Sequence, residues 1–409
     1  MKLLKMILSH LKKLDYVLIA AVLFLSAFGL LMVYSAGYPL GYMKYHDGSY
    51  FFMKQLQWLL IGLAFFSAAA IFPYKAYSKL IRFLVKLSFL MLILVLLPGI
   101  GMEKNNSQRW IQFGSLMIQP SEAVKLVMVI YFAYVYAKKQ KYIADFGKGV
   151  MPPLLILAAV FFLILKQPDL GTAVSILLSC GAVLLCAGLR MRHLLLLGTM
   201  AGAGIAYFAI TAPYRLKRLT SFSDPFQNEN GDGYQLINSY LAIDSGGLWG
   251  NGLGNSVQKL GFLPEAHTDF IMAVITEELG GIGLAVIIWA YLLIMFRGVR
   301  IAVQIDDPFG KLLAVGLTFQ IMIQALFNLG AVFGLLPITG IPLPFVSYGG
   351  SSLLFMLTTA GIFFAPTEIL FTALSNTAKL FASSPSKLMT FSAGKSPVVF
   401  SRNSRYACV

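Results

Sequence analysis

Charged side chains within long apolar stretches are the residues of this sequence most able to do chemistry. A charge in the bilayer core is costly, so each one needs a partner or a water-filled cavity. Glu122 and Lys125 lie three residues apart, so on a helix they share one face and either pair with each other or hold a ligand. Both interpretations stay open. The charged residues in or beside apolar runs are Glu122, Lys125, Lys166, Asp169, Asp269, Glu277 and Glu278.

Two carboxylates lie at the start of a predicted helix over residues 268–296. The motif LPEAHTDF, which precedes and opens this helix, puts Asp269 and Glu265 at the outer boundary between lipid and water. A substrate that is anchored in the membrane would meet a carboxylate at such a boundary. Carboxylates at a helix start also interact favourably with the helix dipole, so simple capping is the alternative.

Two further motifs mark helix starts. The motif QPSE, shortly after Arg109, puts Pro120 in a first helical turn and lets Ser121 satisfy free N–H groups. The motif QPDLGT is typical of a helix that breaks and restarts, with Asp169 as the cap of the second helix. Capping alone explains both motifs, and a role in binding is the other interpretation.

The last motif is an apolar segment, 337–348, that three prolines and a glycine keep from forming a regular helix. In a membrane protein such a segment lies inside the protein beside a cavity, because lipid cannot satisfy its backbone. Gly349, Gly350 and Ser351 follow and begin the next predicted helix. Their N–H groups and hydroxyls suit an anion such as a phosphate, and a tight packing turn is the alternative.

Composition indicates which kind of element must position these residues. The chain has 409 residues, of which 58% are hydrophobic and 12% charged, and its mean hydropathy is +0.77. Soluble domains carry about 25% charged residues, so a soluble protein is excluded. The apolar runs are continuous rather than alternating, which predicts an all-α polytopic membrane protein. About ten spans are expected, near residues 16–36, 54–72, 81–98, 118–137, 151–166, 169–189, 193–212, 268–296, 312–334 and 349–372.

The charge pattern excludes other classes and sets an orientation. The net charge of +15 would suit a nucleic-acid partner, but 22 of the 32 Lys and Arg fall in loops and chain termini that one topology puts on the same side. By the positive-inside rule that side is the cytoplasm, so both termini are cytoplasmic and no nucleic-acid partner is expected. The three cysteines form no C-x-x-C pair, so neither a disulfide framework nor a zinc site is predicted.

The predicted organisation has three parts. Residues 1–15 are a basic cytoplasmic N-terminus, 16–372 form the membrane domain, and 373–409 are a basic, Ser-rich, disordered cytoplasmic tail. Within the membrane domain, residues 213–267 form one long external loop between the seventh and eighth spans. This loop is much longer than a connection between antiparallel helices requires, and such loops are usually functional.

These motifs together resemble the SEDS family of bacterial shape, elongation, division and sporulation proteins. The resemblance covers about residues 10–372, and the order and spacing of the motifs fit throughout. The segments at 252–260 and 265–269 are more similar to the FtsW and SpoVE branch, which acts in division and sporulation, than to the RodA branch of elongation. The matching motifs are Arg109-Trp110, QPSE at 119–122 with Lys125, PDLGT at 168–172, the run at 252–280 and PLPFVSYGGSS at 342–352.

The resemblance implies a membrane glycosyltransferase that polymerises lipid II into peptidoglycan strands and releases undecaprenyl diphosphate. A carboxylate must deprotonate the attacking sugar hydroxyl, which points to Asp269, and cations must stabilise the departing pyrophosphate. No cofactor is firmly implied, and a divalent cation, Mg or Mn, held at Asp269 is the one candidate. The residues expected to bind substrate or pyrophosphate are Arg109, Glu122, Lys125, Lys259, Glu265, Ser347, Gly349, Gly350 and Ser351, with Pro120, Ser121, Asp169, His267 and Thr268 in supporting roles.

The resemblance also implies partners and a place of action. Members of the family act with a class B penicillin-binding protein, a transpeptidase that crosslinks the strands, and with other membrane proteins of the divisome. We therefore expect a multi-pass protein of the bacterial plasma membrane at the division septum. A lipid II flippase is the alternative activity, because polar cavities with buried charges also suit transport. A non-catalytic scaffold for the penicillin-binding protein is a third interpretation.

Overall fold

The computed structural model describes residues 15–104, 107–114, 116–143, 145–211, 213–228, 231 and 233–364. Apart from Asp15, the predicted cytoplasmic N-terminus lies outside the described residues. The predicted tail, 373–409, and the end of the last predicted span also lie outside them.

The described residues are almost entirely helical, as the continuous apolar runs predict. Six helical segments are long and apolar enough to cross a membrane: α2, α3, η2 with α6, α8, α11 and α12. α7 and α13 are shorter apolar helices, and α4 and α5 carry several charged residues. The helices that overlap the predicted spans are α2 (Tyr16–Tyr45), α3 (Tyr50–Ile71), α4 (Tyr74–Leu96), α5 (Pro120–Lys138), α6 (Met151–Leu165), α7 (Leu170–Cys186), α8 (Met191–Thr211), α11 (Ile271–Gln304), α12 (Pro308–Val332) and α13 (Gly350–Phe363). The short turns η1 (Gln140–Tyr142) and η2 (Phe146–Val150) join α5 to α6.

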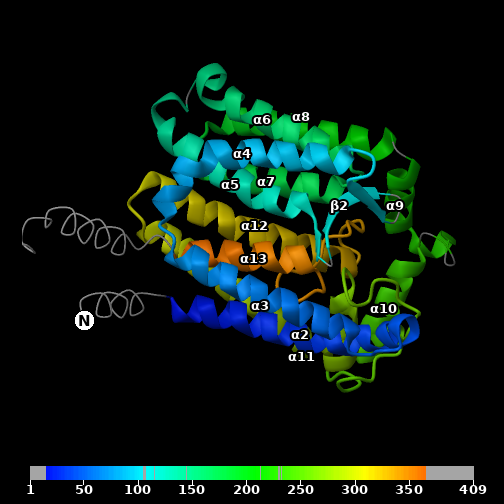
Figure 1. Cartoon of the computed structure of the whole chain (residues 1–409). Helices are drawn as coiled ribbons and strands as arrows, with labels where there is room; N and C mark the ends of the chain where they lie inside the picture. The colour runs from blue at the N-terminus through cyan, green and yellow to red at the C-terminus, as the bar shows by residue number, and fades with distance from the viewer. Residues whose placement is uncertain are drawn as a thin grey trace, which may run out of the picture. The chain divides into compact units, whose positions relative to one another are not determined.

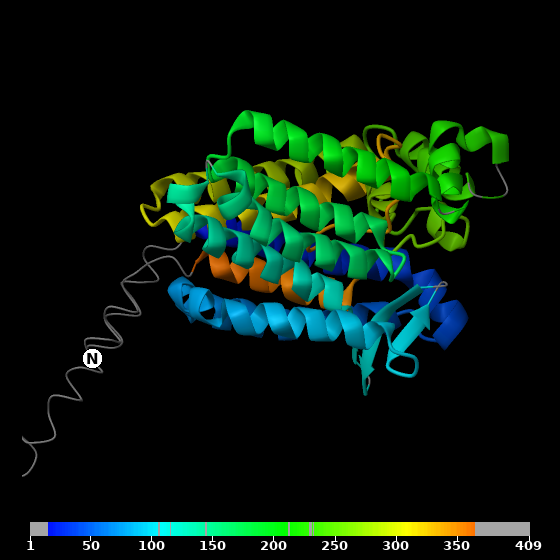
Figure 2. The ribbon, with the colours of Figure 1, turned by 90° about the horizontal axis from the view of Figure 1, so that it is seen from above.

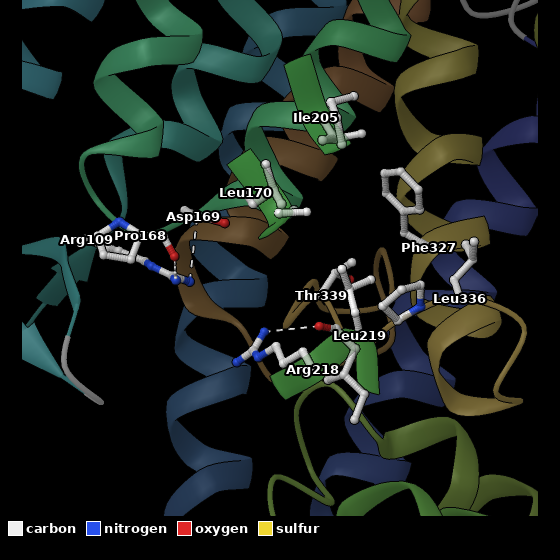
Figure 3. A pocket seen from close by; sticks show the side chains of 15 residues that line it. Arg109, Pro168, Asp169, Leu170, Ile205, Arg218, Leu219, Phe327, Leu336 and Thr339 are labelled. Carbon is white, nitrogen blue, oxygen red and sulfur yellow. Dashed lines mark hydrogen bonds and ion pairs between the residues drawn. The ribbon is translucent and has the colours of Figure 1, made fainter. Parts of the chain in front are cut away.

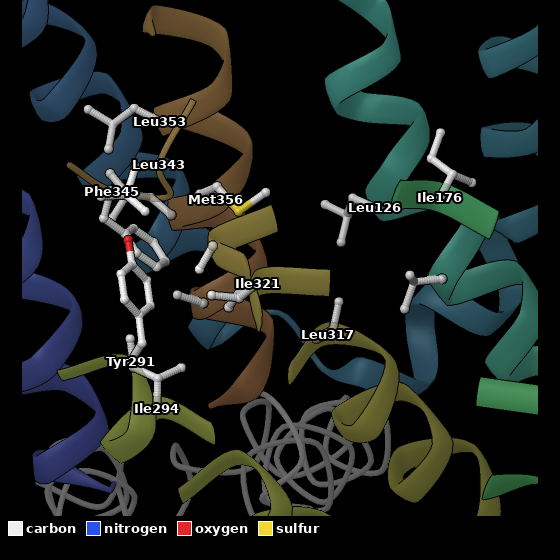
Figure 4. Packing of buried hydrophobic residues seen from close by; sticks show 14 of the residues in the cluster. Leu126, Ile176, Tyr291, Ile294, Leu317, Ile321, Leu343, Phe345, Leu353 and Met356 are labelled. Carbon is white, nitrogen blue, oxygen red and sulfur yellow. The ribbon is translucent and has the colours of Figure 1, made fainter. Parts of the chain in front are cut away.

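α12 is the central helix of the described region and packs against α5, α7 and α11, while α13 packs mainly against α3 (Figure 1). Apolar side chains of these helices meet in one core, among them Leu126, Ile176, Ile321 and Met356 (Figure 4). α8 has a different environment, because Ala209 is the one residue of this helix that is buried within the described residues. Such an exposed apolar helix suits lipid as its surrounding medium.

A small antiparallel sheet corrects the all-α prediction. Its strands are β1 (Gly101–Lys104), β2 (Ser107–Phe113) and β3 (Leu116–Ile118), in the order β1-β2-β3. The strands are three to seven residues long, too short to produce a period-2 pattern that stands out beside a long helix. Figure 2 shows the sheet at the same end of the helices as α9 and α10.

The predicted long loop also contains regular structure. α9 (Pro213–Ser223), η3 (Pro225–Asn228), α10 (Tyr234–Gly246) and η4 (Gln258–Leu260) lie within residues 213–267. α10 packs against α11 and buries Leu236 and Ala242. The polar composition of this stretch conceals these short helices, because tertiary packing rather than propensity stabilises them.

The predicted helix over 268–296 is interrupted. α11 has non-helical backbone angles at Gly280 (φ 66°, ψ −161°), a region that residues with a side chain rarely adopt. A Cβ at this position would lie 2.4 Å from the backbone nitrogen of Gly250. The loop at 246–252 therefore packs directly against the kink.

The segment between α12 and α13 confirms the prediction of a non-helical, buried stretch. Leu343, Phe345 and Val346 are at most 2% exposed, and no regular helix forms within residues 337–349. Gly29 of α2 makes room for this segment, since a Cβ there would lie 2.5 Å from the Cα of Val346. The segment is thus enclosed by helices.

Candidate functional site

Arg109 projects from β2 to the corner between α6 and α7. Its Nε donates a hydrogen bond to the carbonyl of Gln167 at 3.1 Å, and its Nη2 donates to the carbonyl of Pro168. Its Nη1 lies 3.7 Å from Oδ2 of Asp169. Asp169 caps α7 as predicted, because its Oδ1 accepts the N–H of Thr172 at 3.1 Å. The sheet is thereby tied to the start of α7.

A pocket of about 210 Å³ adjoins this corner (Figure 3). Arg109, Asp169 and Arg218 form its polar part. The rest of the wall is mainly apolar and comes from α7, α8, α12 and the segment that follows α12. A pocket of this kind suits an amphiphile with an anionic head and a hydrocarbon chain. The apolar lining includes Leu170, Val174, Ile205, Phe327, Leu336 and Ile338.

Arg218 is a pocket residue that the sequence reasoning missed. It lies on α9, and its Nη1 donates a hydrogen bond to the carbonyl of Ile338 at 3.0 Å (Figure 3). The sequence carried one signal, the basic pair Lys217 and Arg218 within the long external loop. Only the helical turn of α9 decides which of the two faces the pocket.

Asp269 lies just before α11, and its main chain is tied to α12. Its backbone carbonyl accepts a hydrogen bond from Nδ2 of Asn328 at 2.7 Å. The side chain is half-buried, and within the described part of the chain the carboxylate accepts no hydrogen bond and forms no ion pair. Asp269 is not among the described residues that line the pocket. Its carboxylate lies beside the segment that forms one wall, because a Cβ on Gly340, the residue after the lining residue Thr339, would lie 3.4 Å from its Oδ2.

The environment of Asp269 favours its neutral form. Burial raises the pKa of Asp269 to about 7, and the negative charge of Glu265 adds to the rise. The positive charges of Arg218 and Arg109 oppose this shift, while Asp169 contributes a further rise. A carboxyl group whose pKa lies near the working pH is well suited to accept a proton during a reaction.

Glu122 and Lys125 form a buried ion pair inside the helices. Nζ of Lys125 lies 2.8 Å from Oε1 of Glu122 and donates a hydrogen bond to Oε1 of Gln324 at 2.7 Å. The Oε2 of Glu122 is buried and has no hydrogen-bond partner within the described residues. Neither side chain is among the described residues that line the pocket, so the pair connects α5 to α12.

Lys259 is also held in a separate polar cluster. Its Nζ lies 2.7 Å from Oε1 of Glu278 and donates a hydrogen bond to Oγ of Ser35 at 2.9 Å. The adjacent Glu277 accepts the N–H of Val257 at 2.9 Å. These contacts fasten η4 and the residue before it to α11 and α2. The ammonium group of Lys259 is therefore not brought together with Arg109 and Arg218.

Protein contacts occupy the predicted anion site at the start of α13. The N–H of Gly349 donates to Oε1 of Gln55 at 3.3 Å. A Cβ on Gly350 would lie 2.2 Å from Nε1 of Trp58, which shows how closely the two helices approach. Ser351 is 1% exposed, and its hydroxyl accepts a backbone N–H just before α5. The packing turn describes this region better than a phosphate site does.

The predicted supporting residues around Asp269 hold the main chain. Ser347 donates its hydroxyl to the carbonyl of Thr268 at 2.7 Å. Thr268 donates its own hydroxyl to Oε2 of Glu265 at 2.7 Å, on the exposed side of the loop. The ring of His267 packs against Phe51, with ring centroids 4.4 Å apart. These contacts shape the loop rather than line the pocket.

The motif at the start of α5 is structural in the same sense. Pro120 is the first residue of the helix, where its missing N–H has no cost. Ser121 is fully buried, and its hydroxyl accepts a hydrogen bond from Nε2 of Gln119 at 3.1 Å. That amide also donates to Oδ2 of Asp169 at 3.4 Å. The motif thus connects α5 to the polar edge of the pocket.

Among the described residues, no three His, Cys, Asp or Glu side chains are grouped as a metal site. Asp269 would offer a divalent cation one carboxylate ligand. Mg²⁺ is commonly bound by one or two carboxylates together with the phosphates of a substrate. The donor set therefore fits a cation that arrives with a phosphate rather than a resident metal.

Comparison with known sequences identifies the family. A family model described as a cell cycle protein, and named for FtsW, RodA and SpoVE, matches residues 15–367. The probable peptidoglycan glycosyltransferase FtsW of Bacillus subtilis (strain 168) is 45% identical, over 86% of this chain and 90% of that protein. Stage V sporulation protein E of the same organism is 42% identical, over 85% of this chain and 95% of that protein.

Solved structures agree with this match. A chain from a peptidoglycan synthase complex, solved to describe how polymerization and crosslinking are coordinated, has a TM-score of 0.70 and 29% identity over 86% of this chain and 97% of that one. The rod shape determining protein RodA of Thermus thermophilus has a TM-score of 0.63 and 26% identity, over 87% and 97% of the two chains.

Fold and pocket together define a polytopic helical membrane protein with a cationic, apolar-walled pocket at one end of its helices. The family match and the relatives narrow this class. The chain belongs to the FtsW, RodA and SpoVE family, which confirms the family that its motifs predicted.

Proposed function

We propose that this protein polymerises lipid II into glycan strands at the outer face of the cytoplasmic membrane. One observation carries the proposal: the half-buried carboxylate of Asp269, which has no hydrogen-bond partner among the described residues, lies near a pocket that has two arginines and an apolar wall, and the charges of both arginines act on it. Lipid II combines a sugar, a pyrophosphate and a prenyl chain. The arginines of the pocket suit the pyrophosphate, and its apolar wall suits the prenyl chain. The carboxylate of Asp269 can act on the sugar hydroxyl.

The enzyme class is that of the relatives, peptidoglycan glycosyltransferase. Curated FtsW proteins with this name are 38% to 45% identical to the chain over most of its length. The lengths also agree, since the chain covers 90% of the Bacillus subtilis FtsW. A match of this extent supports a shared reaction.

The reaction divides the work between two kinds of side chain. Asp269 removes the proton from the attacking sugar hydroxyl while the oxygen of that hydroxyl bonds to the anomeric carbon of the second sugar. The bond between that carbon and the pyrophosphate oxygen breaks, and undecaprenyl diphosphate leaves with the electron pair. Arg109 and Arg218 stabilise the charge that develops on the leaving group.

A divalent cation, Mg²⁺ or Mn²⁺, remains part of the proposal as an accessory. When bound, it would neutralise pyrophosphate charge, with Asp269 as its protein ligand. Lys125, Lys259, Glu122 and Glu265 are assigned to supporting positions in this scheme, because their contacts are with other protein groups.

The proposed topology has ten spans with both termini in the cytoplasm and residues 213–267 outside. The sheet, α9 and α10 lie at one end of the helices (Figure 1), which supports one extracytoplasmic face. The pocket lies at this end, where a substrate in the outer leaflet would enter. Lys and Arg in the opposite loops satisfy the positive-inside rule.

We assign a class B penicillin-binding protein as the partner and the division septum as the place of action, with other divisome membrane proteins nearby. The similarity to FtsW proteins supports the septal role, and the similarity to a chain of a peptidoglycan synthase complex supports the partnership. A sporulation role is the nearest alternative, because stage V sporulation protein E is almost as similar.

Purified protein tests the proposal directly. Wild type in detergent, given lipid II, is expected to form glycan strands, while Asp269→Asn, which removes the proton acceptor, lowers the rate by at least about 100-fold. Gel analysis of the strands, with and without the partner and with a chelator, provides the measurement. Asp244→Asn is the matched control, because Asp244 is an exposed acid on α10, and it is expected to keep full activity.

The same assay separates a polymerase from a flippase. Detergent leaves no bilayer to cross, so strands formed there require a polymerase. Wild type that makes no strands in detergent but moves lipid II between the leaflets of vesicles would overturn the proposal. Equal rates for Asp269→Asn and Asp244→Asn would overturn the role of Asp269.

A further inference from the structure

The main chain at Asp269 is held by hydrogen bonds to three successive backbone carbonyls. The carbonyls of residues 267–269 accept hydrogen bonds, in order, from the N–H of Tyr348 at 3.0 Å, the hydroxyl of Ser347 at 2.7 Å and Nδ2 of Asn328 at 2.7 Å. We call these three donors the carbonyl clamp. They come from α12 and from the segment between α12 and α13, so the loop is fixed from one side.

The clamp is itself anchored to two helices. Nδ2 of Asn328 donates a second hydrogen bond, to the carbonyl of Ile341 at 2.9 Å. Nε2 of Gln324, one turn earlier on α12, donates to the carbonyl of Pro342 at 3.1 Å. From α3, Nε2 of Gln55 donates to the carbonyl of Ser347 at 3.0 Å. The segment that holds the Asp269 loop is therefore tied to both α12 and α3 by side-chain hydrogen bonds.

The buried amide of Asn328 carries a penalty in folding stability. The side chain is 2% exposed, and its Oδ1 has no hydrogen-bond partner within the described residues. A buried acceptor without a partner destabilises a fold, and leucine would fill nearly the same volume without one. The two hydrogen bonds that Nδ2 donates are the gain that offsets this penalty.

We propose that Asn328 and Ser347 are positioning residues that set the place of the Asp269 carboxylate. This inference rests on the proposed function. The carboxylate accepts no hydrogen bond of its own from the described residues, so its main chain decides where it lies. A general base must come within hydrogen-bond reach of the proton it removes, and a displacement of about 1 Å can cost about 100-fold in rate.

Three variants of the full chain test the clamp. Asn328→Leu is expected to lower kcat for lipid II polymerisation by about 100-fold with KM almost unchanged, because substrate contacts stay in place. Ser347→Ala removes the hydrogen bond to the carbonyl of Thr268 and the acceptor of the N–H of Leu343, and it is expected to lower kcat by about tenfold. Gln320→Leu is the matched control. Gln320 is a buried amide two turns earlier on α12 and has no hydrogen-bond partner within the described residues. We expect Gln320→Leu to leave the rate unchanged.

The pH profile separates positioning from a general loosening of the fold. Burial and Glu265 raise the pKa of Asp269 to about 7 against the opposing charges of Arg218 and Arg109, and Asp169 adds to the rise. A carboxylate released from the clamp gains contact with water, which lowers its pKa. The acidic limb of kcat therefore moves to lower pH in Asn328→Leu, whereas in Gln320→Leu, which leaves the carbonyl clamp in place, the limb does not move.

Rates and acidic limbs that match those of Gln320→Leu in both clamp variants would overturn the inference. Ser347→Ala decides the question if Asn328→Leu does not fold, since it removes a single hydroxyl. A wild type that makes no strands, or an Asp269→Asn variant that keeps its rate, would instead overturn the proposed function, and the clamp with it. The two failures are thus distinguished by the wild type and Asp269→Asn alone.

Discussion

Burial and the two pocket arginines have opposite effects on the pKa of Asp269, the proposed base. Burial favours the protonated acid, while each nearby cation favours the carboxylate. Because a general base must be deprotonated to act, the proposed reaction is expected to slow as the pH falls through about 7. The same arginines are assigned to the pyrophosphate, so a change in either one affects both binding and the pH profile.

Arg218→Gln is expected to move the acidic limb of the pH–rate profile upward by roughly half a unit, because it removes a cation that lowers the pKa of Asp269. It also raises KM for lipid II by about tenfold through the loss of a charge-assisted contact. Initial rates across neutral pH at several lipid II concentrations measure both effects. Lys217→Gln is the control, since Lys217 is the exposed neighbour on the same helix. A downward shift of the limb in Arg218→Gln would contradict the assignment.

At the scale of elements, the kink in α11 decides how the outer loop is held. Gly280 lets the chain turn with a positive φ, and the backbone of Leu248 and Gly250 packs against it. The residues just before the kink, Glu277 and Glu278, hold the loop that contains Lys259. The conformation at Gly280 therefore permits the close packing of the loop at 246–252 against α11.

Gly280→Ala is expected to destabilise the protein by more than about 3 kcal/mol, because the alanine combines a strained φ with a backbone clash. The thermal midpoint in detergent, followed by size-exclusion chromatography, measures the loss. Gly181→Ala in α7 is the matched control. A Cβ at Gly181 meets no atom within 4 Å, so stability should stay within about 1 kcal/mol. Equal stability of the two variants would show that the kink is not required.

At the scale of the whole molecule, the distribution of Lys and Arg supports the proposed orientation. The proposed outer end carries the sheet, α9, α10 and the pocket. The loops and termini that are proposed to be cytoplasmic carry most of the Lys and Arg. A substrate in the outer leaflet can reach the pocket only in this orientation. Topology is therefore a condition of the proposed function.

Cysteine labelling in intact cells tests the orientation. After replacement of Cys180, Cys186 and Cys408 by serine, Leu248→Cys is expected to react with a membrane-impermeant maleimide, because Leu248 is 73% exposed on the proposed outer face. Lys141→Cys, in η1 on the proposed inner face, is expected to react only after permeabilisation. The reverse pattern would invert the topology and place the pocket in the cytoplasm.

Several features follow from local sequence and were predictable. Asp169 caps α7 and Pro120 opens α5, since capping depends on residues within one helical turn. The buried, non-helical stretch at 337–348 follows from its prolines. The small sheet and the short helices α9 and α10 were missed, because brief elements carry little periodic signal and are stabilised by what they pack against.

The sequence by itself determined that the bilayer is the solvent, that helices cross it, and that Asp269 is an acid at a helix start, because hydropathy, charge and capping are local properties. Only the tertiary structure decided which cation meets which anion. Lys125 pairs within α5 and reaches Gln324, Lys259 is held by Glu278, and Arg218 reaches the pocket. The contact of Lys125 with Gln324, 199 positions away in the chain, depends on helix register and packing, and several pairings were compatible with the same local pattern.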